Sequence, residues 1–337
     1  MKPWLKNKRI IAVSYLAGGG LLILSAVVGI LCGATGLDLS ALLTALMQGD
    51  LDHPAVRILL YVRLPRVWGA IFCGGALAVA GAVIQGVLNN RLASPGIIGV
   101  NAGAGLAVTV CSALGILGGW RMSLFAFVGA FASVMLVSLG ARRWGASKGT
   151  VILLGVALNS LLGAASDTIK LVDPDVSIMT THFKVGDFSG VTYAGLMPAT
   201  AVILGALILI LTLSNQLDVL TLGDDTARGL GQHTGAVRVI CLLLSALLAG
   251  AAVSVCGLLS FVGLLIPHAV RRTSGSLHRH LLPLCALFGG GFVALCDTFS
   301  RVIFAPYEIP VGIIMAFLGA PFFVFILIKG KGGQDHA

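Results

Sequence analysis

The sequence has very little charge for its length. Only 10% of its 337 residues are Asp, Glu, Lys or Arg, whereas about 25% of a typical soluble domain is charged. Hydrophobic residues make up 57% of the chain, and the mean hydropathy is +1.01. Many uncharged stretches approach or exceed the roughly 20 apolar residues that a helix needs to cross a bilayer. This composition excludes a soluble core and predicts an all-α protein that spans a membrane many times.

Several patterns that would indicate cofactor or nucleic-acid chemistry are missing. The seven cysteines lie in or beside apolar runs and form no C-x-x-C pair, so they are interpreted as packing residues. We expect His268, His278 and His280 to be solvated loop residues rather than metal ligands. The net charge of +9 is scattered between apolar runs, which argues against a nucleic-acid surface. No G-x-x-x-x-G-K-[ST] loop occurs, so this chain cannot cradle ATP phosphates. We therefore expect no catalytic site, metal or cofactor in this chain.

Segments free of Asp, Glu, Lys and Arg mark the expected spans. There are nine such segments, which are 10–37, 67–90, 92–120, 122–141, 149–166, 188–217, 239–270, 281–296 and 309–328. The seventh is unusually long and contains Gly250, Gly257 and Gly263. It is either one long helix or two shorter helices that fold back at this glycine-rich middle.

The distribution of charge decides between nine and ten spans. Lys and Arg are concentrated in residues 2–9, before the first run, and Lys329 and Lys331 follow the last run. Both termini are therefore expected to be cytoplasmic, because positive residues collect on that side. Two ends on one side require an even number of crossings. The sequence thus predicts a single transmembrane domain over residues 1–337 with ten transmembrane helices in a bacterial inner membrane.

Three stretches carry a more specific pattern. They are RLPR at 63–66, which continues through GGALAVAGAVIQ to NRLASPG at 90–96; LGDDTARGLG at 222–231; and SFVGLLIPH at 260–268, followed by EIPVG at 308–312 and LGAP at 318–321. In their order and spacing these motifs resemble the FecCD family of ABC permeases. One departure is Arg91, where the family usually has proline. It lies in an expected cytoplasmic loop, where it would alter a turn rather than the mechanism.

The resemblance implies the permease subunit of an importer for iron-siderophore chelates, haem or cobalamin. It also implies a homodimer with the pathway at the subunit interface, two cytoplasmic ABC ATPase subunits that bind ATP and Mg²⁺, and an extracytoplasmic substrate-binding protein. An ion-driven secondary transporter is the alternative, although such proteins commonly keep ionisable groups near the bilayer midplane, and here the carboxylates fall near span ends. An intramembrane hydrolase would need a partnered His inside the bilayer, and only His268 approaches it.

Three arginines are expected at the outer ends of spans. Arg63, Arg66 and Arg301 match arginines that dock acidic residues of the binding protein in the family. A guanidinium group can hold a carboxylate through two parallel hydrogen bonds. Asp297 lies one helical turn before Arg301 and is placed to hold it. The alternative is that each arginine only anchors a span end by reaching lipid phosphate.

The second motif lies in a polar segment of about residues 217–234 between two spans, and the resemblance makes it the element that couples to the ATPase. The residues assigned to this role are Gly223, Asp224, Asp225, Ala227 and Gly231. Small residues at every fourth position would form a smooth stripe that accepts side chains of another protein. The two aspartates would complement the positive end of a helix. The alternative is an ordinary amphipathic surface helix.

Two further sites are expected along the fifth span. The resemblance places a cytoplasmic gate just before it, at Ser147, Lys148, Gly149 and Thr150. Asn159 and Asp167 lie within the span and at its outer end. Polar groups at such depth face either a pathway or a neighbouring helix, and the sequence leaves both alternatives open for these two residues.

Overall fold

The computed structural model contains only helices among the residues it describes, which are 3–33, 36, 38–116, 118–143 and 148–331. The helices are α1 (Pro3–Leu31), α2 (Leu39–Gln48), α3 (Pro54–Ile58), η1 (Leu59–Arg63), α4 (Leu64–Leu88), η2 (Pro95–Ile98), α5 (Val100–Ala113), α6 (Gly119–Arg143), α7 (Lys148–Val172), α8 (Pro174–Val185), α9 (Tyr193–Thr212), α10 (Ser214–Thr221), α11 (Asp224–Gly229), α12 (Thr234–Cys256), α13 (Val262–Ser274), α14 (His278–Val302) and α15 (Val311–Lys331). The expected all-α class is confirmed.

The helices vary widely in their capacity to span a membrane. Within the described residues, seven helical segments are long and apolar enough to cross one, and shorter apolar helices include α5 and the described part of α15. The long seventh candidate of the sequence is two helices, because α12 ends at Cys256 and α13 begins at Val262. Gly257 stands at the break with a φ of 69°, a left-handed conformation that glycine adopts without strain.

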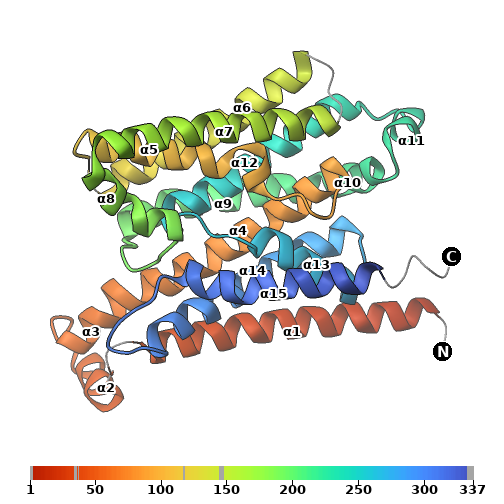
Figure 1. Ribbon diagram of the computed structural model, residues 1–337. Coiled ribbons are helices and arrows are strands. Elements are labelled where there is room, and N and C mark those ends of the chain that lie inside the picture. Colours follow the sequence, from red (N-terminus) through yellow and green to blue (C-terminus); the bar gives the residue numbers. More distant parts are fainter. Residues whose placement is uncertain (1–2, 34–35, 37, 117, 144–147, 332–337) are drawn as a thin grey trace.

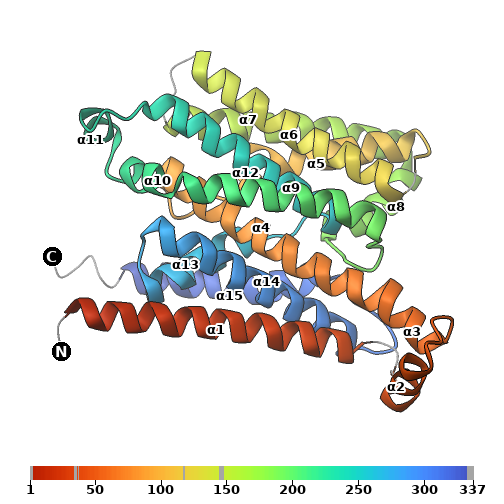
Figure 2. The ribbon, with the colours of Figure 1, turned by 180° about the vertical axis from the view of Figure 1, so that it is seen from behind.

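The start of α1 and the end of α15 lie at the same end of the bundle (Figures 1 and 2). We call this the terminal end, and it also carries α10 and α11. The opposite, distal end carries α2, α3 and α8. The shared position of these two helix ends agrees with an even number of crossings.

Helix α4 forms the centre of the bundle. In its most apolar window 83% of the residues are buried, against 17% for α1 and α7 at the periphery. It packs against α12, α13 and α14, and small residues allow this contact to be close. A Cβ atom added to Gly81 would lie only 1.9 Å from the carbonyl oxygen of Gly263 on α13. The glycine-rich sequence of α4 is therefore explained by backbone contact between helices.

The second span is longer than the uncharged segment that predicted it. The expected span began at residue 67, yet one continuous helix runs from Pro54 to Leu88 through α3, η1 and α4. Its middle section, η1, is a π-helix, in which Leu64 donates its N–H to the carbonyl of Leu59. Pro65 has no N–H with which to continue the α-helical pattern, which accounts for the wider turn before it.

Candidate functional site

The three candidate docking arginines lie together at the distal end, but they are buried. Arg63, Arg66 and Arg301 are only 3%, 5% and 3% exposed. The expectation of freely exposed guanidinium groups at span ends is therefore corrected. Their burial is possible because carboxylates of the same chain pair with Arg66 and Arg301, and backbone carbonyls accept hydrogen bonds from Arg63 and Arg301.

Asp297 on α14 is the hub of this distal cluster. Arg66 Nε lies 3.0 Å from Asp297 Oδ1, and Arg301 Nε lies 3.1 Å from Asp297 Oδ2. The predicted placement of Asp297 beside Arg301 is thus confirmed. Arg66 also holds Glu308, with 2.6 Å between Nη1 and Oε2, and Glu308 is the more exposed of the two carboxylates.

The same cluster binds the end of the first helix. Arg63 Nη1 donates to the carbonyl oxygens of Ile30 and Leu31 at 2.7 Å each. Arg301 donates through Nη2 to the carbonyl of Gly29 and through Nη1 to that of Cys32. These carbonyls are among the last of α1 and just beyond it, where helical partners are lacking. The arginines therefore join α1, α4 and α14 at one point.

The expected coupling segment is at the terminal end, but its small residues do not form an exposed stripe. Helix α11 has only six residues, and Gly223 and Gly231 lie outside it with φ angles of 106° and 80°. Ala227, within α11, is fully buried. The prediction of an exposed stripe is therefore wrong, because its middle residue, Ala227, packs inside the protein. The outward-facing side is formed by Asp225 and its exposed neighbours, and Asp225 lies in the first turn of α11, as expected.

Asp224 has a different role from Asp225. Its carboxylate accepts two hydrogen bonds from Arg238 Nη2, at 2.8 and 2.9 Å. Arg238 is buried in α12, so this pair fixes the start of α11 to a long apolar helix. The sequence analysis did not single out Arg238, and the only local signal is its position as the last charge before an apolar run.

A second anchor was also missed. His278, expected to be a solvated loop residue, is 2% exposed, which corrects that interpretation. Its backbone N–H donates to Asp218 Oδ1 at 2.9 Å, and its ring Nδ1 lies 2.6 Å from the same oxygen. A carboxylate only accepts hydrogen bonds, so Nδ1 carries the proton. Sixty positions separate the two residues, and no local pattern links them.

The expected gate falls partly on residues that the structure does not describe. Ser147 lies outside the described residues, and Lys148 begins α7. Gly149 is exposed and Thr150 is partly buried in the first turn of that helix, at the terminal end. This position agrees with the side on which the gate was expected.

The two candidate pathway residues of α7 have different surroundings. Asn159 Nδ2 donates to the carbonyl of Gly96 at 2.9 Å, which ties α7 to η2. Asp167 is on the exposed side of the helix, 3.9 Å from Lys170 Nζ. Asn159 therefore takes part in helix packing. Asp167 is exposed on α7, so both alternatives, a pathway or another helix, stay open for it.

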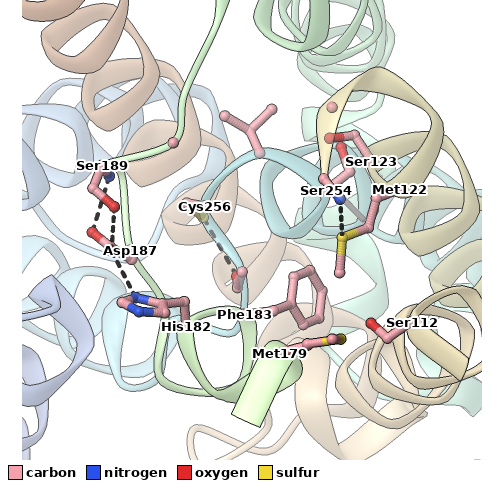
Figure 3. Close-up of a pocket in the computed structure, with 15 residues that line it drawn as sticks. Ser112, Met122, Ser123, Met179, His182, Phe183, Asp187, Ser189, Ser254 and Cys256 are labelled. Atoms are coloured by element: carbon pink, nitrogen blue, oxygen red, sulfur yellow. Dashed lines mark hydrogen bonds and ion pairs between the residues drawn. The ribbon is translucent and has the colours of Figure 1, made fainter. Parts of the chain in front are cut away.

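A cavity of about 470 Å³ opens at the distal end between α5, α6, α8 and α12 (Figure 3). Its lining includes Ser112, Met122 and Met179, so it is mostly neutral. At one side lies Asp187, which accepts hydrogen bonds from the N–H and hydroxyl of Ser189 at 3.0 and 2.5 Å. Burial alone would raise the pKa of Asp187, but the hydrogen bonds with Ser189 and His182 and the charge of Arg66 hold that pKa below its ordinary value.

Known proteins resemble the chain over most of its length. The family model of the FecCD transport family matches residues 20–329. The hemin transport system permease protein HmuU of Yersinia pestis is 36% identical, over 81% of this chain and 84% of that protein. The Fe(3+) dicitrate transport system permease protein FecD of Escherichia coli strain K12 is 37% identical, over 86% and 90%.

A solved structure shows the same architecture. It is described as an inward-facing conformation of an ABC transporter, and it matches with a TM-score of 0.83 and 27% sequence identity. The match covers 96% of this chain and 99% of the solved chain. Together with the sequence match, this shows that the chain belongs to the FecCD transport family.

Proposed function

We propose that this chain is the membrane-spanning permease of a binding-protein-dependent ABC importer that carries an iron chelate or haem across the cytoplasmic membrane. The observation that carries the proposal is the match to the FecCD family over residues 20–329. Relatives named for hemin and ferric dicitrate transport favour an iron chelate or haem over cobalamin. The chain is a transport subunit, and ATP hydrolysis belongs to a separate ATPase.

The proposed topology has ten spans with the terminal end in the cytoplasm. The spans would be α1, α3 to α4, α5, α6, α7, α9, α12, α13, α14 and α15. The shorter members α5 and α13 would reach through the bilayer with the help of the adjoining segments outside the α-helices. Such segments are tolerated where they are covered by protein, as η2 is by α5 and α7.

We propose a homodimer whose interface and pathway include α7. One side of α7 packs on α5, and its other side exposes Ser160, Ala164 and Thr168 together with larger apolar residues. Hydroxyl groups and small residues on a spanning helix favour contact with another helix or with water over contact with lipid tails. Asp167 at the distal end of this surface and Thr150 near its terminal end would then line the pathway and the gate.

The coupling role is assigned to the outward-facing side of α11 and its flanks. Leu222 and Leu230 are 61% and 65% exposed at the terminal end, beside the exposed Asp225. Apolar side chains exposed beyond the membrane favour burial in a partner. We propose that this surface binds the ATPase, and that Gly223, Asp224, Ala227 and Gly231 shape and hold it.

Docking of the binding protein is assigned to the distal cluster in a revised form. Because Arg66 already holds Glu308, an acidic group of the binding protein would have to displace that carboxylate. Arg63 and Arg301 would keep α1 and α14 in place while this exchange occurs. We therefore propose that, on docking, an acidic group of the binding protein replaces Glu308 as a partner of Arg66.

Uptake into proteoliposomes tests the proposed function. With the ATPase and the binding protein, we expect uptake of a ferric chelate or haem that requires ATP. Omission of either partner should abolish it. Uptake that persists without both proteins and collapses with a protonophore would instead support an ion-driven secondary transporter.

A further inference from the structure

Helices α4 and α14 form a closely packed antiparallel pair. A Cβ atom on Gly74 would lie 2.4 Å from the carbonyl oxygen of Gly289, and one on Gly75 would lie 3.0 Å from that of Ala286. Their backbones are therefore in direct contact near the middle of the bundle. Packed interfaces of this kind shift between discrete arrangements and do not deform gradually, so the two helices are expected to move as one unit.

The distal ends of the pair are joined by charge. Arg66 lies in the first turn of α4, and Asp297 lies near the end of α14. Their 3.0 Å ion pair is buried, and Asp297 also holds Arg301. Breaking a buried pair is costly because it leaves a charge without compensation. The distal cluster therefore fixes the two helices to each other.

The terminal ends of the pair meet at His278. This residue begins α14, and a Cβ atom on Gly86, in the last turn of α4, would lie 2.8 Å from its Nε2. Nε2 is buried and has no hydrogen-bond partner among the described residues. The opposite ring nitrogen, Nδ1, is bound by Asp218 of α10. The imidazole thus sits where α4, α10 and α14 come together.

Helix α10 leads directly into the proposed ATPase-binding surface. Asp218 lies four residues before Leu222, and its carboxylate also caps the backbone N–H at the start of α14. A displacement of α11 that reaches α10 would therefore act on the first residue of α14. Because the pair continues to Arg66 and Asp297, the contact connects opposite ends of the molecule through contiguous packed elements.

We propose that His278, held by Asp218, is the positioning residue through which the coupling segment acts on the α4–α14 pair. The pair carries the effect to the distal cluster, so that docking outside and ATP hydrolysis inside influence each other. Such influence is reciprocal when it acts on binding equilibria. This inference rests on the proposed function, since it assumes that α11 contacts the ATPase and that the distal cluster receives the binding protein.

The test uses the complete transporter in nanodiscs and measures ATP hydrolysis with and without saturating, substrate-loaded binding protein. The readout is the stimulated rate divided by the variant's own basal rate. We expect Asp218→Ala and His278→Ala each to lower this ratio roughly fivefold or more, the lower end of typical coupling between sites. The double variant should lower it no further, because both changes remove the same contact. Asn215→Ala, at an exposed position on α10, is the matched control and should keep the wild-type ratio.

A second variant guards against general damage to the fold. Gly86→Ala removes no hydrogen-bonding group but pushes the imidazole ring away from α4, and we expect it to lower the ratio as well. Wild-type ratios in the Asp218→Ala and His278→Ala complexes, with or without lower thermal stability, would overturn the inference. So would additive losses in the double variant. A separate experiment tests the coupling assignment itself. If α11 does not bind the ATPase, the permease with Leu230→Asp will still copurify with the ATPase.

Discussion

At the scale of single residues, the distal cluster shows how a membrane protein keeps several charges inside. Asp297 pairs with both Arg66 and Arg301, and the last carbonyls of α1 accept hydrogen bonds from further guanidinium donors. A substitution there has two separable effects, one on the stability of the permease and one on docking. The two effects can be measured separately, because Asp297 is the buried carboxylate of the cluster and Glu308 is the partly exposed one.

Asp297→Ala should mainly destabilise the permease. It leaves Arg66 and Arg301 buried without their shared carboxylate, and loss of one partner of a buried pair typically costs about 3–5 kcal/mol. Thermal unfolding of the purified permease measures the loss. Asp167→Ala is the control, because that side chain is 77% exposed and only weakly paired with Lys170, so its effect should stay within about 0.5 kcal/mol. Equal melting temperatures for the two variants would contradict a structural role for Asp297.

Glu308→Gln should affect docking instead. It frees Arg66 for an acidic group of the binding protein, and a partly exposed ion pair is worth about 0.5–1 kcal/mol, so affinity should rise roughly two- to fivefold. Binding to the permease in nanodiscs, measured by surface plasmon resonance, gives this affinity. An unchanged or weaker affinity would show that Glu308 does not compete for the docking site.

At the scale of elements, the coupling segment combines a buried support with an exposed surface. Ala227 is enclosed, Asp224 is tied to Arg238, and Leu222 and Leu230 remain exposed. The four-residue spacing of small residues selects Ala227 as a contact, yet Ala227 faces the interior of the protein. Coupling is therefore tested at the exposed Leu222 and Leu230.

Leu230→Asp should leave the permease folded and weaken its assembly with the ATPase. The side chain is 65% exposed, so the change costs little within the chain but places a charge in the proposed apolar contact. Copurification of the ATPase from detergent measures the result. Ala227→Trp provides the contrast, because overfilling a buried site costs about 1–3 kcal/mol and should lower the melting temperature of the permease alone. Normal assembly and transport with Leu230→Asp would remove this surface from the coupling site.

At the scale of the whole molecule, the bundle is organised around α4. Helix α7 lies at the periphery. Only 17% of the residues in its apolar window are buried by the chain itself, so one side of this helix is left uncovered. A second copy of the chain would cover this side in the proposed homodimer.

Ala164→Cys should report that homodimer directly. In a Cys32→Ser background, which removes the cysteine that the structure shows as exposed, a short bis-maleimide should link two copies through residue 164. Crosslinked dimers on a denaturing gel are the expected result. Leu209→Cys on α9 is an exposed control that should stay monomeric. Equal crosslinking at both positions would mean random collision, and none at either would exclude α7 from the interface.

The sequence by itself determined the helical class, the approximate spans, the shared side of the termini and the family. These properties depend on local composition and on short motifs, because lipid requires each helix to satisfy its own backbone hydrogen bonds. The even number of crossings required the long seventh segment to split, and the structure placed the break at Gly257, where a positive φ ends the helix locally.

Only the tertiary structure decided which charges are buried and what they hold. Arg66 and Asp297 are 231 positions apart, and Asp218 and His278 are 60 apart, so neither pair leaves a local pattern. Spans defined as segments without Asp, Glu, Lys or Arg start the second span at residue 67, just after Arg66. This definition cannot distinguish an arginine paired inside a bundle from one exposed at a span end. For the same reason, spacing placed Ala227 on a surface, while the fold of the segment turned it inward. Burial depends on the elements that pack together, and that information exists only in three dimensions.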